Sequence, residues 1–212
     1  MKILPFGDRA LLAEFGSLEQ TMNAFLACDA ARAPGVIELI PAAATVLVRI
    51  DPNTLSLRAA EQWLTSTCSR ASSNENVGRT AGPSVSIPVR YDGPDLESAA
   101  LVLGISADEL VSRHSQALWQ CAFIGFVPGF AYLASKDANF DMPRRETSRE
   151  TVPAGSVGLA GEFTGIYPRS SPGGWQILGT TSLTLWDEAR DAPAAITPGM
   201  TVRFEVEAQW RG

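Results

Sequence analysis

The sequence predicts an α+β domain at the N-terminus, joined by a linker to a mainly β domain. Strand and helix patterns alternate over roughly the first 70 of the 212 residues. A polar, glycine-rich stretch, ASSNENVGRTAGPS (71–84), then interrupts them. After Trp119, short apolar runs are split by Gly and Pro about every ten residues, which is typical of an antiparallel barrel or sandwich. We therefore place one domain at 1–80, with its linker from about 71, and the other at 81–212.

The N-terminal domain has three strand patterns and two helix patterns. Ser17 and Gln20 form a capping box that predicts the start of the first helix. A second amphipathic pattern includes Leu57, Ala60 and Leu64. The strand patterns are ALLAEF (10–15), VIELI (36–40) and TVLVRI (45–50). The resulting order, β-α-β-β-α, favours a ferredoxin-like layer.

The second domain opens with a strand and two helices before its β-rich part. VSIPV (85–89) is the strand, and a helix runs from Asp95 to Leu103. Ser106 and Glu109 form a second capping box, so His114 falls on the helix that follows.

Composition and charge exclude several classes of function. The net charge of −6 argues against binding to nucleic acid or to an anionic membrane, both of which require a basic surface. Three widely spaced cysteines and a single histidine fit neither a disulfide framework nor a multi-histidine metal centre, so we expect a cytoplasmic protein without a metal site. The N-terminal residues lack the apolar core of a signal peptide, and neither lysine lies in a Walker A loop.

The segment VPAGSVGLAGEFTGIYPRSSPGGWQILG (152–179) is rich in glycine and has only two charged residues. One interpretation is tight barrel corners, where glycine adopts positive φ. The other is a wall of backbone N–H and C=O groups that approaches a ligand closely. The turn from Ser170 to Trp175 is the part that we expect to reach a ligand, with two hydroxyls beside an aromatic ring.

Two polar features are candidates for chemistry. Arg144, Arg145 and Arg149 are the densest basic cluster in an acidic domain, and arginine suits carboxylate or phosphate. The alternative is that they pair with Glu146 and Glu150 on a solvated loop. His114 is either a proton-transfer group or a hydrogen-bonded structural residue.

The stretch FIGFVPGFAYL (123–133) is aromatic and almost uncharged. It is either a core strand entering a turn at Pro128 and Gly129, or a pocket wall that presents Phe126, Phe130 and Tyr132.

Several motifs together resemble a known family. They are GDRALLAEFG near the start, HS at 114–115, FIGFVPGFAYL, MPRRETSRETVPAGSVGLAGEFTGIYP and SSPGGWQILG, in this order. The chain is similar over essentially its whole length to the family of bacterial 5-oxoprolinase B subunits, also called allophanate hydrolase subunit 1 or the Kip inhibitor family.

This resemblance implies an N-terminal α+β domain and a cyclophilin-like barrel domain. It implies a hydrolase complex in which a partner of the C type forms a shared cleft with this chain and a partner of the A type takes part. The substrate would be a small anionic amide, 5-oxoproline, which is opened to L-glutamate. ATP with Mg would act at the level of the complex, and the chain would be inactive alone. Two alternatives stay open: half of a biotin-dependent, urea-type carboxyltransferase, and an inhibitor of a sensor histidine kinase.

The resemblance also transfers site residues by position. The catalytic set is His114, Arg144, Arg145 and Ser171. The expected substrate-binding residues are Ser115, Phe126, Pro128, Gly129, Pro153, Gly155, Ser156, Gly173, Gly174 and Trp175. One departure is Thr180, because relatives usually place an arginine there, and its loss could weaken an anion contact or a contact with a partner.

Overall fold

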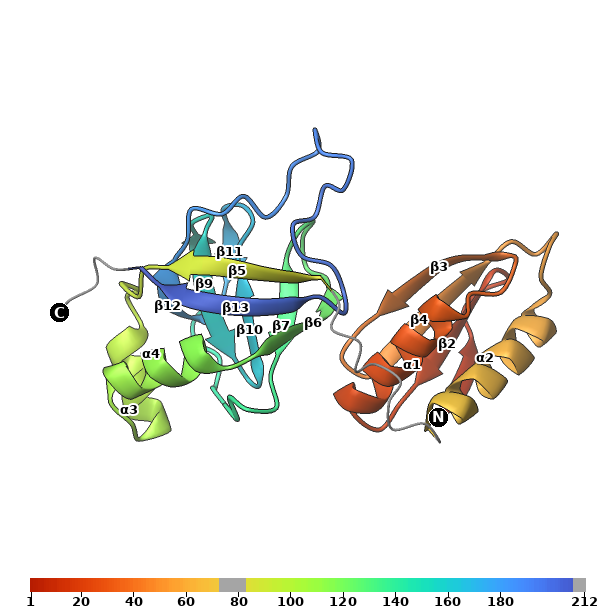
Figure 1. Ribbon diagram of the computed structural model, residues 1–212, viewed down its shortest axis with the longest axis horizontal. Helices are drawn as coiled ribbons and strands as arrows, with labels where there is room; N and C mark the ends of the chain where they lie inside the picture. Colours follow the sequence, from red (N-terminus) through yellow and green to blue (C-terminus); the bar gives the residue numbers. More distant parts are fainter. Residues whose placement is uncertain (73–82, 208–212) are drawn as a thin grey trace. The chain divides into compact units, whose positions relative to one another are not determined.

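The computed structural model describes residues 1–72 and 83–207. The chain divides into two compact units, Met1–Ala81 and Gly82–Gly212, which we call unit 1 and unit 2 (Figure 1). Most of the predicted linker lies outside the described residues. Among those that are described, no helix has the length and apolar character needed to cross a membrane.

Unit 1 is one antiparallel sheet with two helices on the same face (Figure 1). Its strands, in the spatial order β1-β2-β4-β3, are β1 (Lys2–Pro5), β2 (Ala10–Glu14), β3 (Val36–Pro41) and β4 (Thr45–Ile50). The helices are α1 (Leu18–Ala30) and α2 (Leu57–Ser72). On β4, Val46, Val48 and Ile50 alternate into the core, as the period of a strand requires.

The predicted elements of unit 1 are all present, and β1 is an additional strand. The element order is therefore ββαββα, and β1 forms the edge beside β2. A ferredoxin-like domain has the order βαββαβ, with a strand after its second helix. The ferredoxin-like assignment therefore stays a prediction.

Unit 2 is built on a seven-stranded sheet that nearly closes into a barrel. The spatial order is β12-β9-β10-β7-β6-β13-β5, and only the β13–β5 pair is parallel. The strands are β5 (Ser84–Val89), β6 (Trp119–Ile124), β7 (Ala131–Ala134), β9 (Ser156–Ala160), β10 (Phe163–Ile166), β12 (Gln176–Thr180) and β13 (Thr201–Val206). A bridge joins the two ends of the sheet: the Arg90 amide donates to Thr180 O at 2.9 Å, and the Thr180 amide donates to Arg90 O at 2.8 Å. This single bridge brings the two ends of the sheet together, so that the sheet nearly closes into a barrel.

Two helices and a small second sheet complete unit 2. The helices α3 (Leu96–Leu103) and α4 (Ala107–Gln116) pack on β12 and β13, respectively. Ser106 Oγ accepts from the Glu109 amide at 3.1 Å, as the capping box predicts. The second sheet pairs β8 (Arg149–Val152) with β11 (Ser171–Gly173).

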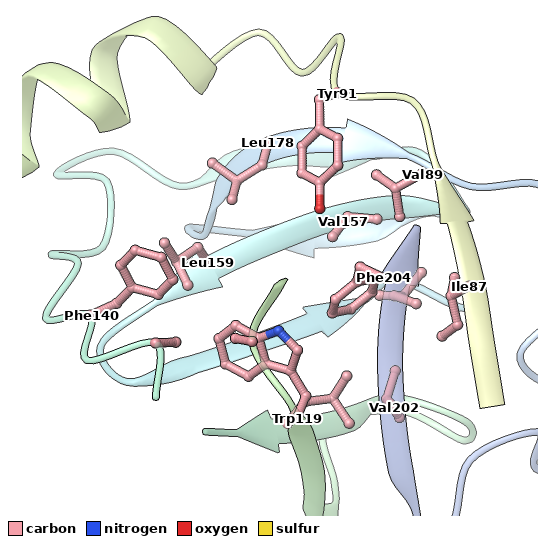
Figure 2. Close-up of a cluster of buried hydrophobic side chains, with 14 of the residues drawn as sticks. Ile87, Val89, Tyr91, Trp119, Phe140, Val157, Leu159, Leu178, Val202 and Phe204 are labelled. Carbon is pink, nitrogen blue, oxygen red and sulfur yellow. The ribbon is translucent and has the colours of Figure 1, made fainter. Parts of the chain in front are cut away.

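Large side chains fill the interior of the barrel. Figure 2 shows side chains from three strands meeting there: Trp119 from β6, Val157 and Leu159 from β9, and Val202 and Phe204 from β13. All five are buried. The barrel is therefore a packed core, and a ligand must bind at its loops and edges.

Candidate functional site

The arginine cluster, Arg144, Arg145 and Arg149, lies between β7 and the start of β8. Arg145 Nη1 and Arg149 Nη2 both donate to Asp95 Oδ1, at 2.8 and 2.7 Å. Arg144 is exposed. One prediction was that these arginines pair with Glu146 and Glu150. Arg145 and Arg149 instead share the carboxylate of Asp95, some 50 residues earlier in the chain.

Asp95 anchors this cluster to the barrel. Only 2% of the residue is exposed, and its second oxygen, Oδ2, accepts from the Ile177 amide on β12 at 2.7 Å. A buried carboxylate is tolerated when hydrogen bonds and opposite charges surround it. Because one carboxylate balances only one of the two guanidinium charges, the pair leaves a positive charge at this surface. The sequence indicated Asp95 only as a helix start, since its partners are far away along the chain.

Backbone hydrogen bonds hold the arginine segment against the glycine-rich turn. The Arg145 amide donates to Gly174 O at 2.8 Å, and Gln176 Nε2 donates to Pro143 O at 3.2 Å. The structure thus brings two predicted site residues, Arg145 and Gly174, into direct contact, and Ser171 and Gly173 lie on β11, which pairs with the strand that follows the arginine segment.

An aromatic cluster lies beside this turn and consists of Phe130, Tyr132, Phe163, Tyr167 and Trp175. Its rings make edge-to-face contacts: the centroids of Phe130 and Trp175 are 5.2 Å apart, and those of Tyr132 and Trp175 are 5.5 Å apart. Trp175 and Phe130 are both buried. Trp175 therefore packs beneath the glycine-rich turn, and its ring is not accessible to a ligand.

The exposed Arg144 lies close to the two tyrosines of the aromatic cluster. Burial raises the pKa of both Tyr132 and Tyr167, and the positive charge of Arg144 opposes this rise in both. The Trp175 amide is also hydrogen bonded to Tyr167. A Cβ on Gly173 would lie 2.2 Å from the Tyr167 hydroxyl oxygen, so only glycine fits there. A guanidinium and a phenol can each donate a hydrogen bond to an oxyanion, and of the two tyrosines only Tyr132 is partly exposed.

Phe126 extends the aromatic cluster toward solvent. Its backbone has φ of +67°, its ring makes an edge-to-face contact with Phe130 at 5.6 Å, and 59% of the residue is exposed. Positive φ is costly for a bulky residue, and such strain collects at functional sites. Of the three aromatic residues proposed for a pocket wall, Phe126 is exposed, Tyr132 is half-buried and Phe130 belongs to the core.

His114 lies in the core of unit 2, away from solvent. The Tyr91 hydroxyl is 2.7 Å from Nδ1, and Nε2 is 2.8 Å from Thr164 Oγ1, which in turn donates to Gly158 O at 2.9 Å. Because the Thr164 proton goes to Gly158, Nε2 carries the histidine proton and Nδ1 accepts from Tyr91. Burial lowers the pKa of His114 to about 3. This corrects the catalytic expectation: a neutral, fully buried ring with both nitrogens bonded is a structural group.

The other predicted site residues lie in three places. The Ser115 hydroxyl donates to Ser112 O within α4, at 3.3 Å. Pro128 and Gly129 lie in the turn before β7, Pro153 and Gly155 lie in the turn before β9, and Ser156 is the first residue of β9.

The turn before β9 shows what part of the glycine run does. Gly155 has φ of +80°, and a Cβ there would lie 2.3 Å from Thr181 O. Its amide donates to Tyr167 O at 2.8 Å, and its carbonyl accepts from the Thr181 amide at 2.9 Å. Both backbone groups are thus used in packing, which favours the barrel-corner interpretation at this position.

Thr180 lies at the barrel closure next to another cation. Arg90 Nη2 donates to Thr180 Oγ1 at 3.3 Å, and Thr180 Oγ1 donates to Asp92 Oδ1 at 3.1 Å. An arginine from a different segment, Arg90, therefore lies where the resemblance leads one to expect an arginine in the strand itself, and Arg90 is ion-paired with Asp92. A hollow of about 320 Å³ adjoins this point, lined by Arg90, Thr180, Thr181, Ser182 and Glu207.

Comparison with known proteins identifies the family. Residues 1–196 match the carboxyltransferase domain, subdomain C and D. The chain belongs to this family. It is 43% identical over 176 residues to the B subunit of the 5-oxoprolinase of Escherichia coli O157:H7, covering 81% of this chain and 78% of that protein. It is 32% identical over 222 residues to the B subunit of the 5-oxoprolinase of Bacillus subtilis (strain 168), covering 96% and 91%. The resemblance based on the motifs is thereby confirmed.

Two solved structures share the fold of this chain. TTHA0988 superposes with a TM-score of 0.76 at 34% identity, covering 94% of this chain and 40% of that one. The Kluyveromyces lactis urea carboxylase superposes with a TM-score of 0.67 at 18% identity, covering 97% of this chain and 21% of that one. This chain thus spans less than half the length of either protein, and the second likeness concerns the fold alone.

Proposed function

We propose that this chain is the B subunit of an ATP-dependent 5-oxoprolinase. It would act with a protein of the C type, which completes a shared cleft, and with a protein of the A type. The observation that carries this proposal is the similarity, over most of the chain, to proteins named as B subunits of 5-oxoprolinase. ATP and Mg would be bound at the level of the assembled complex, in the cytoplasm, and the chain alone would have no turnover.

The arginine cluster and the tyrosines suit the proposed substrate. 5-Oxoproline carries a carboxylate beside a lactam, and ring opening places negative charge on the amide oxygen. Arg144, exposed beside Tyr132, would bind the carboxylate, and the fixed guanidinium of Arg145 would favour the developing charge. Among the described side chains, buried Arg145 Nε and Arg149 Nη1 lack a hydrogen-bond partner, a feature that recurs at functional sites.

The fold that we assign to each unit is consistent with this proposal. We infer that unit 1 is ferredoxin-like, with β1 in the edge position, and that unit 2 is a cyclophilin-like barrel. The nearly closed sheet supports the assignment of unit 2, and the urea carboxylase structure shares the fold over 97% of this chain.

An Arg144→Ala variant tests the role of the site. In the assembled complex, it should raise the KM for 5-oxoproline by roughly ten- to a hundredfold, because a hydrogen bond to a charged group contributes about 1.5–3 kcal/mol. Arg203→Ala, at an exposed position on β13, is the matched control and should leave kinetics unchanged. Normal kinetics in the Arg144 variant would remove this residue from substrate binding.

The second candidate is half of a biotin-dependent amide carboxyltransferase. The family match and the fold shared with urea carboxylase favour it. Avidin separates the two, because it would block a biotin-dependent complex and leave 5-oxoprolinase turnover intact.

A further inference from the structure

Two cysteines of unit 1 lie together between its helices. Cys28 is in the last turn of α1, and Cys68 is near the end of α2. The two helices pack against each other on the same face of the sheet (Figure 1). Cys28 is fully buried and Cys68 is 6% exposed, and both are present as thiols.

The two thiols interact directly and are not equivalent. They form a side-chain hydrogen bond, which raises the pKa of Cys28 and lowers the pKa of Cys68. Because its pKa is lowered, Cys68 is the sulfur that more readily becomes a thiolate. The thiolate is the reactive form of cysteine, so the pair has an attacking sulfur and a second sulfur within reach of it.

The third cysteine provides an internal reference. Cys121 lies in β6, where its thiol contacts the Phe123 carbonyl at 3.8 Å. Burial raises the pKa of Cys121 to about 12, so this thiol stays protonated and unreactive. All three thiols are buried, and the difference between them is the presence of a neighbouring sulfur.

We propose that Cys28 and Cys68 are a redox modification site, which forms an intramolecular disulfide when the protein meets a peroxide. The Cys68 thiolate attacks one peroxide oxygen, which forms an S–O bond, breaks the O–O bond and releases hydroxide that is protonated to water. The Cys28 sulfur then attacks the sulfenic acid sulfur of Cys68, forming the S–S bond and expelling a second water. Two thiols are oxidised and one hydrogen peroxide is reduced to two waters. The disulfide ties α1 to α2, and its formation is independent of the proposed oxoprolinase role.

The test uses the whole native chain treated with hydrogen peroxide. After quenching, the protein is denatured, its remaining thiols are alkylated and its peptides are analysed by mass spectrometry. The expected result is a linked peptide joining Cys28 to Cys68, with Cys121 alkylated and the link reversed by dithiothreitol. Unchanged thiols, chain-to-chain links, or Cys68 oxidised to sulfinic acid with Cys28 still alkylated would each overturn the proposal.

Variants sharpen the result. Cys121→Ser should retain the linked peptide, and Cys28→Ser should lose it. A Cys28→Ser protein that still loses the Cys68 thiol to a disulfide would contradict the pairing. The peptide map of the wild-type protein shows by itself whether Cys28 and Cys68 are linked. A folding defect in either variant would therefore not change the conclusion.

Discussion

Among single residues, two buried polar side chains hold unit 2 together in different ways. His114 is neutral and links Tyr91, Thr164 and Gly158 through a chain of hydrogen bonds. Asp95 is surrounded by two guanidinium groups and a backbone amide. The sequence left two roles open for His114, because burial depends on residues far from it in the chain. The partners of Asp95 could not be predicted for the same reason.

The neutral state of His114 makes stability depend on pH. An unfolded histidine binds a proton below pH 6.5, whereas native His114 does so only near pH 3. The unfolded state therefore binds more protons between these values, and the free energy of unfolding falls as pH falls through this window. Between pH 7.5 and pH 5, we expect His114 to lower the free energy of unfolding by about 2 kcal/mol. Urea unfolding of the wild type and of His114→Gln at pH 7.5 and pH 5 measures this loss of stability. An equal loss in both proteins would refute the assignment.

Asp95→Asn should destabilise the protein strongly. The substitution leaves two partly buried guanidinium groups without their shared carboxylate, which typically costs about 3–5 kcal/mol. Glu38→Gln is the matched control, because it breaks the Arg49–Glu38 pair at 2.6 Å, whose side chains are 52% and 44% exposed. An exposed pair contributes only about 0–1 kcal/mol. Similar urea midpoints for the two variants would show that the Asp95 network contributes little.

At the level of secondary structure, the sequence predicted features that depend on neighbouring residues, and it did not predict pairings between distant segments. The Ser17 and Ser106 caps both form, with hydrogen bonds to Gln20 and Glu109, because a cap depends on neighbouring residues. The strand β1 has only four residues and includes a proline, so its sequence shows little alternation. The bridge between Arg90 and Thr180 joins segments 90 residues apart, and no local pattern predicts it.

Glycine substitutions test the packing of the barrel corners. Gly155→Ala introduces positive φ strain and places Cβ 2.3 Å from the Thr181 backbone oxygen, so we expect a loss of about 2–5 kcal/mol. Gly161→Ala has positive φ but open space around its Cβ, and should lose only about 1–2 kcal/mol. Thermal unfolding of both variants compares them. A Gly155 variant as stable as the Gly161 variant would mean that the corner can relax.

For the molecule as a whole, the sequence predicted the family and a mixed α and β architecture. The motifs quoted for the resemblance are continuous stretches, so they can be recognised without knowledge of the fold. The candidate site was predicted in part: the arginine segment and the glycine-rich turn do meet, whereas Asp95 was missed and His114 and Trp175 belong to the core. Proximity between distant segments and burial are properties of the folded chain and leave no local signal.

The proposed role in a 5-oxoprolinase complex is tested by 5-oxoproline-dependent ATP hydrolysis. The assay is run first with the purified chain and then with the chain co-assembled with its partners of the C and A types. We predict no turnover by the chain alone and clear turnover by the assembly, with L-glutamate as the product. An intact assembly that hydrolyses no ATP in response to 5-oxoproline would contradict this role.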